Sequence, residues 1–164
     1  MFMPLPVPER YNRHSMLEYR TIVPPYAPSF FDELTALGTE VFGQFDPTEL
    51  VWRLTHMPDP SVQVASDQGL VGFKLGYASG RDRYHSWLGG VRQESRRRGI
   101  AVQLMNLQHE WLRSRGYTSV GTATLPENVA MIALNMRFGF RVIGSQCQAD
   151  RPRVLLSKNL AERD

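Results

Sequence analysis

A run of arginines followed by a glycine is the feature of the sequence best suited to bind an anion. Arg96, Arg97 and Arg98 precede Gly99, and an amphipathic segment with helical spacing begins directly after them. The apolar positions of that segment are Ile100, Leu104, Leu107 and Trp111. A helix N-terminus offers unpaired N–H groups and a partial positive charge, and arginine side chains pair with phosphate oxygens. The pattern therefore indicates a phosphate site, with a solvated basic turn as the alternative.

Two blocks of the sequence resemble one known family. Residues 96–101, Arg-Arg-Arg-Gly-Ile-Ala, are similar to the Arg/Gln-x-x-Gly-x-Gly/Ala motif of the GNAT superfamily of N-acetyltransferases. Residues 128–140 resemble that family's Asn-x-x-Ala-x-x-Leu-Tyr-x-x-x-Gly-Phe segment, and the two blocks occur in the family's order. The resemblance extends over residues 62–160, whereas the residues before that range agree only in the expected order of elements.

The resemblance implies that the basic turn binds acetyl-coenzyme A (acetyl-CoA). In the family, backbone amides of the first block hold the pyrophosphate of this cofactor. The positions that the resemblance assigns to cofactor binding are Gly89, Gly90, Val91, Arg96, Arg97, Arg98, Gly99, Ile100, Ala101, Asn128, Met131 and Asn135. Gly89 and Gly90 suit the close approach of a ligand to a strand, and a β-bulge at this pair is compatible with that role. For Asn128, capping of the helix that follows is the favoured role.

Transfer of an acetyl group to an amine requires a base for the amine and a hydrogen-bond donor for the thioester oxygen. The resemblance implies His85 as the base, because family members often carry a Glu or His six positions before the residue that is Val91 here. Histidine titrates near neutral pH, although a half-buried strand histidine can also be purely structural. Glu40 and Tyr84 are weaker candidates for the base. The oxygen donor is expected to be a backbone N–H near Gly90 or Val91.

The departing thiolate benefits from an acid, and here the sequence departs from the family. Many members carry a tyrosine four residues before the Gly-Phe pair, whereas this chain has Asn135 at that position. An asparagine amide donates a hydrogen bond but supplies no proton. We therefore expect Asn135 to contact the cofactor and the thiolate to leave with the help of solvent. A plain polar position on the last helix is the alternative for Asn135.

These residues need elements that hold them in place, and the hydrophobic pattern predicts the order β-α-α-β-β-β-α-β-α-β-β. Strands are expected at residues 17–23, 62–65, 70–78, 84–91, 117–124, 140–143 and 154–158. Helices are expected at 29–42 with Ser29 as cap, from the cap Asp46 to before Pro58, at 95–115, and at 128–139. The resemblance implies an α/β (α+β) fold with a mixed, mostly antiparallel sheet, helices on both faces, and a splayed central pair of strands at 84–91 and 117–124.

The composition is that of a globular protein with one domain. The chain has 164 residues, of which 42% are hydrophobic and 21% charged, and we expect a loose arm at 1–15 and a single domain at 16–164. A net charge of +3 suits an anionic ligand but argues against a dedicated nucleic-acid binder.

The single cysteine, Cys147, excludes an internal disulfide, and no apolar run approaches the roughly 18 residues of a membrane span, so a cytoplasmic protein is expected. His56 and His109 have no partners at metal-ligand spacing, so no metal site is expected.

The residues and the resemblance together predict an N-acetyltransferase that uses acetyl-CoA. A primary amine would attack the thioester directly in a ternary complex, because no cysteine lies near the two blocks. The alternative is a protein of the same fold that binds an acyl-CoA as a sensor without turnover. The acceptor is expected to be a small-molecule or peptide amine, with neither nucleic acid nor a membrane as partner, and a homodimer is expected only by analogy with the family.

Overall fold

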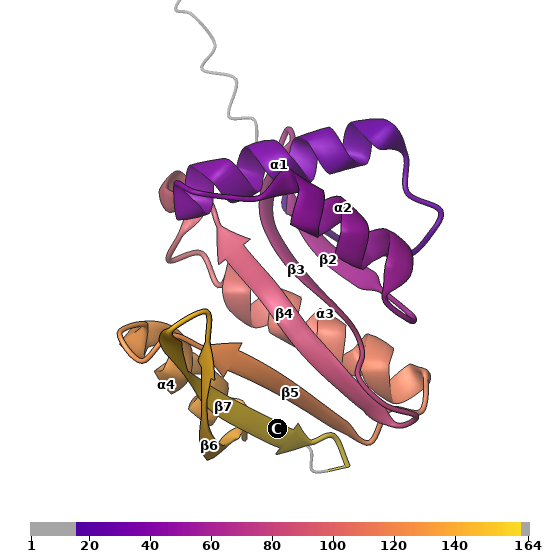
Figure 1. Cartoon of the computed structure of the whole chain (residues 1–164). Helices are drawn as coiled ribbons and strands as arrows, with labels where there is room; N and C mark the ends of the chain where they lie inside the picture. The colour runs from indigo at the N-terminus through magenta and orange to yellow at the C-terminus, as the bar shows by residue number, and fades with distance from the viewer. Residues whose placement is uncertain (1–15, 162–164) are drawn as a thin grey trace, which may run out of the picture.

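One mixed sheet with helices on both faces forms the framework of the protein (Figure 1). The computed structural model describes residues 16–161, so the arm expected at 1–15 lies outside the described residues. The strands are β1 (Glu18–Ile22), β2 (Ser61–Ser66), β3 (Leu70–Ala78), β4 (Arg83–Val91), β5 (Ser119–Thr124), β6 (Arg141–Gln148) and β7 (Arg151–Asn159). The helices are α1 (Pro28–Phe42), α2 (Pro47–His56), α3 (Ile100–Ser114) and α4 (Val129–Arg137), with a short 3₁₀ turn, η1 (Gln93–Ser95), ahead of α3. The predicted order of elements is confirmed.

The sheet has the order β1-β2-β3-β4-β5-β7-β6, and β4–β5 is its parallel pair. These two strands pair only over three residues of each, from Arg83 opposite Ser119 to His85 opposite Gly121, although both continue beyond that point. The Thr122 hydroxyl donates a 2.9 Å hydrogen bond to the carbonyl of Ser86, where the pairing ends. From there the strands diverge, as Figure 1 shows. The predicted splayed central pair is therefore confirmed.

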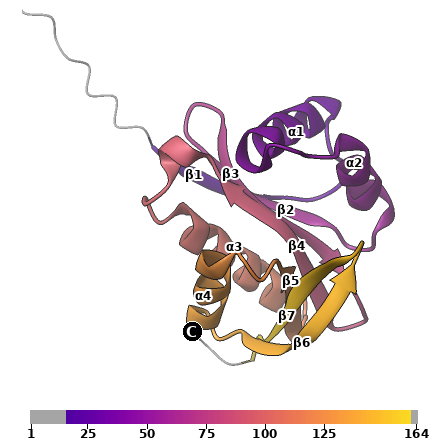
Figure 2. The same ribbon diagram turned by 60° about the vertical axis from the view of Figure 1, so that its left-hand side comes forward.

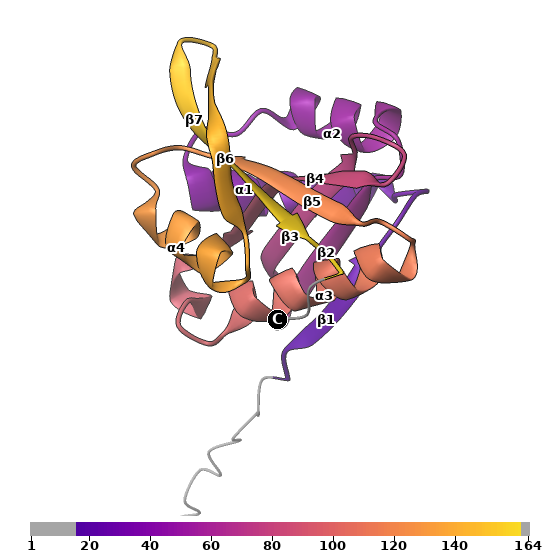
Figure 3. The same ribbon diagram turned by 90° about the horizontal axis from the view of Figure 1, so that it is seen from below.

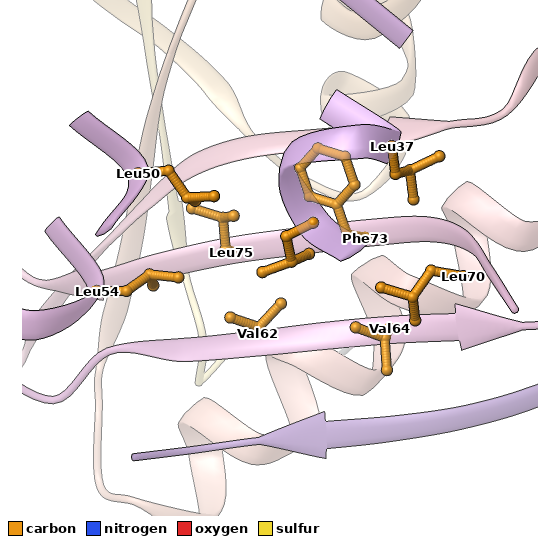
Figure 4. Close-up of a cluster of buried hydrophobic side chains, with 9 residues drawn as sticks. Leu37, Leu50, Leu54, Val62, Val64, Leu70, Phe73 and Leu75 are labelled. Atoms are coloured by element: carbon orange, nitrogen blue, oxygen red, sulfur yellow. The ribbon is translucent and has the colours of Figure 1, made fainter. Parts of the chain in front are cut away.

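Helices α1 and α2 cover one face of the sheet. The apolar cluster beneath them comprises Leu34, Leu37, Leu50, Leu54, Val62, Val64, Leu70, Phe73 and Leu75, most of which are labelled in Figure 4. Helix α2 is positioned by its local sequence: Asp46 Oδ1 accepts hydrogen bonds from the N–H groups of Thr48 and Glu49 at 2.9 and 3.3 Å, and Pro47 occupies the first turn. The predicted cap at Asp46 is thus confirmed.

Helices α3 and α4 lie on the opposite face (Figures 2 and 3). Their side chains form two further buried clusters with the sheet. One comprises Ala78, Tyr84, Met105, Leu112, Val120, Phe140, Leu156 and Leu160, and the other comprises Ala65, Val71, Ile100 and Leu104. Because successive side chains of a strand point to opposite faces, each central strand contributes to the cores on both sides.

Several predicted boundaries are wrong, each for a local reason. Helix α3 begins at Ile100 rather than at residue 95, because Gly99 takes the left-handed conformation (φ 75°) and η1 precedes it. Helix α1 has Ala27 at its cap position without a side-chain hydrogen bond, so Ser29 is not the cap. The final two strands extend further along the chain than the pattern predicted and form a hairpin with a turn at Ala149 and Asp150.

A β-bulge occurs in β4, but not at the expected glycine pair. Leu75 of β3 lies opposite Leu88, and Gly76 lies opposite Ser86, so the extra residue is Trp87. The bulge turns the indole of Trp87 to the α1–α2 side, where it packs against the same cluster as Leu88. Gly89 and Gly90 follow in regular pairing with β3.

Candidate active site

A cleft of about 570 Å³ lies where β4 diverges from β5. It is bounded by the end of β4, the turn before α3, the first turn of α3, the start of α4 and the end of α1. A volume of this size is in the range of small-molecule and cofactor sites. The predicted cofactor residues that line it are Gly89, Gly90, Val91, Arg96, Arg97, Gly99, Ile100, Ala101, Asn128 and Met131.

The first turn of α3 opens this cleft to an anion. No side chain caps the helix, and its first intrahelical bond is donated by Gln103 to the carbonyl of Gly99 at 3.0 Å. The N–H groups of the residues between them therefore have no partner within the helix. Arg97 (φ 61°) and Gly99 (φ 75°) both take left-handed conformations, which bend the turn around the helix end. Such a turn with unpaired N–H groups and adjacent arginine charge binds phosphate oxygens.

The three arginines of the turn point in different directions. Arg96 donates from Nε to the carbonyl of Val91 at 3.0 Å, and this bond holds its guanidinium against the end of β4. Arg97 is exposed and lines the cleft. Arg98 lies outside the cleft lining and forms a 3.0 Å ion pair with Asp67 in the turn between β2 and β3. Arg96 and Arg97 are therefore placed to meet an anion, whereas Arg98 secures the turn to the sheet.

Backbone groups of β4 face the gap between β4 and β5. The N–H of Arg92 donates to the carbonyl of Val71 at 2.8 Å, on the β3 side. Because the N–H groups of successive strand residues point to opposite sides, that of Gly90, like that of Arg92, faces β3, whereas those of Gly89 and Val91 face the gap. The N–H groups that can donate a hydrogen bond to a thioester or amide oxygen are therefore those of Gly89 and Val91. Gly90 was expected to share this role and is occupied in the sheet.

His85 lies on the α2 side of β4, at the last residue pair before the strands diverge. It is half-buried, and its ring centroid lies 5.4 Å from that of Tyr77. The guanidinium carbon of Arg53 lies 4.4 Å from the ring centroid of Trp87 and 5.5 Å from that of Tyr77. Burial, and then the charges of Arg53 and Lys74, lower the pKa of His85, so its imidazole is neutral at pH 7.

The group around His85 was not identified in the sequence. Arg53 donates to the hydroxyl of Tyr77 and forms a 2.5 Å ion pair with Glu49, which fixes its position over the indole of Trp87. Arg53 is on α2, whereas Tyr77 and Trp87 are on the sheet, so their spacing along the sequence does not show that they lie together. Trp87 packs against the cluster under α1 and α2, and it also forms the surface on which the guanidinium rests.

Neither of the weaker candidates for the base is placed for that role. The side chain of Tyr84 is buried (1% exposed) and its hydroxyl lies 2.7 Å from that of Ser61; burial raises its pKa far above the ordinary value. Glu40 is on α1 and forms a 3.1 Å ion pair with Arg92, away from the point where β4 and β5 diverge.

The structure separates the two asparagines of the second block. Asn128 caps α4, because its Oδ1 accepts from the N–H of Met131 at 3.3 Å, and it also lines the cleft. Asn135 is buried (2% exposed) at the end of α4, where its carbonyl accepts from the N–H groups of Phe138 and Phe140, and it does not line the cleft. Its position therefore suits the C-terminal turn of α4 better than contact with a cofactor.

Lys74 lines the cleft and was not identified in the sequence. It is in the middle of β3, opposite Gly89 of β4. Burial lowers its pKa from 10.5 to about 8. A lysine flanked by Phe73 and Leu75 within an otherwise uncharged strand is the signal that could have drawn attention to it.

Two other kinds of feature are absent from residues 16–161. In that range no helix combines the length and apolar character needed to cross a bilayer. Over the same range, His, Cys, Asp and Glu side chains do not gather in groups of three or more that could hold a metal ion.

Comparison with solved structures finds the same fold in N-acetyltransferases. The ribosomal-protein-S18-alanine N-acetyltransferase from Escherichia coli has a TM-score of 0.75 at 12% identity, with 91% of this chain and 97% of that chain covered. Ard1 from Thermoplasma volcanium has a TM-score of 0.73 at 17% identity, with 89% and 99% covered. NAA60 from Arabidopsis thaliana, solved in complex with acetyl-CoA, has a TM-score of 0.73 at 16% identity, with 90% and 100% covered.

Comparison at the level of sequence assigns the family. No curated protein matches the chain. The model of the acetyltransferase (GNAT) family matches residues 27–140, a range that begins just before α1 and ends just after α4. It includes the open end of α3, the splayed strands and the cleft between them. The chain therefore belongs to the acetyltransferase (GNAT) family.

Proposed function

We propose that the protein transfers an acetyl group from acetyl-CoA to a primary amine. The observation that carries this proposal is one cleft, which is lined both by the turn and first residues of α3 and by Gly89–Val91 of β4, beyond the last residue pair with β5. Acetyl-CoA has a pyrophosphate, which suits the turn of α3, and a thioester at its far end, which suits the end of β4. The family and the complex of NAA60 with acetyl-CoA support this choice of donor.

In the proposed complex, the pyrophosphate lies on the first N–H groups of α3, and Arg96 and Arg97 add charge. The pantetheine arm follows β4, where the N–H groups of Gly89 and Val91 face the gap. One of these groups would hold the thioester oxygen and stabilise the oxyanion that forms during transfer. The absence of a side chain at Gly89 permits this close approach.

His85 is the proposed base. It lies at the closed end of the gap and its neutral imidazole can take the proton of the attacking amine. The amine then attacks the thioester carbon directly, so that no acyl-enzyme forms. Arg53 acts as a positioning residue, because it lies over the side chains next to His85 and its charge favours the neutral imidazole.

A sensor that binds an acyl-CoA without turnover is the second candidate function. The observation that favours it is the buried Asn135, which stands where many family members carry a tyrosine acid. The two functions differ in one result: only an enzyme releases coenzyme A thiol when an amine is supplied.

Calorimetric titration with acetyl-CoA tests the proposed binding site. Wild type should bind, and Gly99→Glu should lose binding, because a carboxylate would stand at the pyrophosphate position. Gly116→Glu is the matched control, since Gly116 is also left-handed (φ 85°) with open space around it but lies beyond the other end of α3. Equal binding by wild type and Gly99→Glu would contradict the site, and no binding by wild type would contradict the function. A screen of primary amines for thiol release then separates the enzyme from the sensor.

A further inference from the structure

Lys74 is a positively charged side chain inside the cleft that the proposed function leaves without a role. On β3 the side chains of Phe73 and Leu75 belong to the cluster under α1 and α2, so Lys74 between them points to the α3 side. A Cβ atom built on Gly89 would lie 3.6 Å from Cγ of Lys74. The lysine stem therefore crosses directly beside Gly89, whose N–H faces the gap.

Among the described residues, no carboxylate pairs with Lys74. Within residues 16–161 its ammonium has neither an ion pair nor a hydrogen bond with another side chain. Strand β2 presents Gln63 in register with it, and α3 presents Leu104 and Met105 to the same part of the cleft. On β4 the titratable neighbour is His85, whose pKa the charge of Lys74 helps to lower. An unpaired ammonium at this place is available to a ligand that acquires negative charge.

Lys74 and His85 flank the gap from opposite faces of the sheet. His85 points to the α2 side, with Tyr77 and Trp87, and Lys74 points to the α3 side. In acetyl transfer the amine and the sulfur are different substituents of the reacting carbon. A base on one face and an acid on the other can therefore serve the two groups separately.

We infer that the ammonium of Lys74 lies beside the sulfur of the departing coenzyme A, stabilises the thiolate as it forms and then donates a proton to it. This inference rests on the proposed function. The amine nitrogen forms a bond to the thioester carbon, and His85 accepts the proton that the nitrogen loses. The carbon–sulfur bond then breaks, its electron pair goes to sulfur, and a proton moves from Nζ of Lys74 to the thiolate. Neutral Lys74 regains a proton from solvent.

The acidities of the two groups are well matched. Lys74, with a pKa of about 8, is mostly protonated at pH 7, and a thiol has an ordinary pKa of about 8.5. Proton transfer between groups of such similar pKa is nearly balanced in free energy. The buried Asn135, by contrast, has no proton to give. Lys74 therefore fills the role that the family's tyrosine would have.

Titration of bound coenzyme A tests the inference without an amine acceptor. The ultraviolet absorbance of the thiolate reports the pKa of the thiol in complex with wild type, Lys74→Met and Lys74→Arg. The wild-type complex should ionise its thiol at least about one pH unit below free coenzyme A, because a cation next to an acid favours the charged form. Lys74→Met should abolish the shift, and Lys74→Arg should keep it, because the guanidinium retains the charge. Binding of desulfo-coenzyme A, which lacks the thiol, should be similar for all three proteins.

The outcomes separate this inference from the proposed function. A bound thiol with the same pKa in wild type and Lys74→Met would overturn the role of Lys74 and leave the proposed function intact. Failure of wild type to bind coenzyme A would overturn both. Incubation with acetyl-CoA followed by mass spectrometry adds a second check: an acetyl group on Lys74 itself would make that residue an acceptor and overturn its role as proton donor.

Discussion

Two basic side chains with lowered pKa values, Lys74 and His85, lie on opposite faces of the sheet near the point where β4 and β5 diverge. Burial is the main cause for both Lys74 and His85, and neither has a carboxylate close by that would restore its charged form. Burial of an unpaired basic group costs folding free energy, so such groups mark functional sites more often than structural ones. Each therefore allows a prediction about pH.

Replacement of Lys74 by methionine should stabilise the protein at pH 7. Below pH 8 the folded and unfolded states both carry the ammonium, and the folded state bears the full cost of burying it. Between about 8 and 10.5 the unfolded state holds a proton that the folded state has released, so wild-type stability rises with pH. The lowered pKa of Lys74 corresponds to a change in the free energy of unfolding of at most about 3 kcal/mol, at about 1.4 kcal/mol per pKa unit.

Urea unfolding at pH 7 and at pH 10.5 measures this effect. Lys74→Met should be more stable than wild type at the lower pH, and the difference should shrink towards zero at the higher pH. A variant that is less stable than wild type at pH 7 would show that the ammonium has a stabilising partner, contrary to the structure.

Replacement of His85 by glutamine should lower kcat by about 10²-fold or more, the usual contribution of a general base. In wild type kcat should fall as the pH drops through the lowered pKa of His85, below 6.5, because the protonated imidazole cannot accept the amine proton. The variant should lose this acidic limb of the pH profile. His56→Gln is a suitable control, since His56 is exposed and stacks on Trp52. Unchanged kcat in His85→Gln would assign the base to another group or to water.

Helix α2 is the element that connects local sequence to the site. Asp46 fixes its start, and Arg53, further along the helix, lies over the side chains next to His85. The cap therefore supports the proposed positioning residue, Arg53, as well as the helix. Helix α1, in contrast, begins without a side-chain cap, and its contact with β4 fixes its position: a Cβ on Gly90 would lie 2.6 Å from a methyl group of Val41.

Removal of the α2 cap should destabilise the protein while leaving cofactor binding unchanged. Asp46→Ala should lower the free energy of unfolding by about 0.5–2 kcal/mol, because the N–H groups of Thr48 and Glu49 lose their acceptor. Ser29→Ala is the matched control and should have little effect, since Ser29 does not cap α1. Chemical denaturation measures both, and calorimetry with acetyl-CoA should give the wild-type affinity. A larger loss in Ser29→Ala than in Asp46→Ala would reverse this assignment of caps.

At the scale of the whole molecule, the divergence of β4 and β5 divides one sheet into two halves. The half with β1–β4 carries α1 and α2 on one face and α3 on the other, and the half with β5–β7 lies beside α4 (Figures 1 and 2). The three residue pairs between β4 and β5 are their shared ladder. Beyond them, within residues 16–161, the backbone of β4 no longer pairs with that of β5: the carbonyls of Ser86 and Val91 accept from the side chains of Thr122 and Arg96, and the N–H groups of Gly89 and Val91 face the gap.

Amide hydrogen exchange should detect these free groups. In the unliganded protein the N–H groups of Gly89 and Val91 should exchange faster than that of Arg92, which is bonded to the carbonyl of Val71. Acetyl-CoA should slow exchange at Gly89 or Val91 and leave Arg92 unchanged. Nuclear magnetic resonance can resolve the three amides individually. Equal protection of all three without ligand would show that the gap is closed in solution.

The sequence determined those features that depend on neighbours along the chain. The Asp46 cap, the alternation of β3 and the order of elements all follow from interactions within a few residues, and so does the open start of α3 after Arg96 and Gly99. The start of that helix was predicted too early, because the polar residues before Gly99 suit a helix equally well and only the left-handed turn excludes one. Local patterns are least informative at such boundaries.

The tertiary structure decided which distant residues share the site. Lys74 meets Gly89 through the register of β3 on β4, and Arg53 reaches Tyr77 and Trp87 because α2 packs on one particular face. Register and packing depend on the fit of whole surfaces, which no short stretch of sequence contains. The same fit buried Asn135 away from the cleft to which family resemblance had assigned it. The sequence thus determined the place of the proposed anion site, and only the folded chain decided which titratable side chains lie beside it.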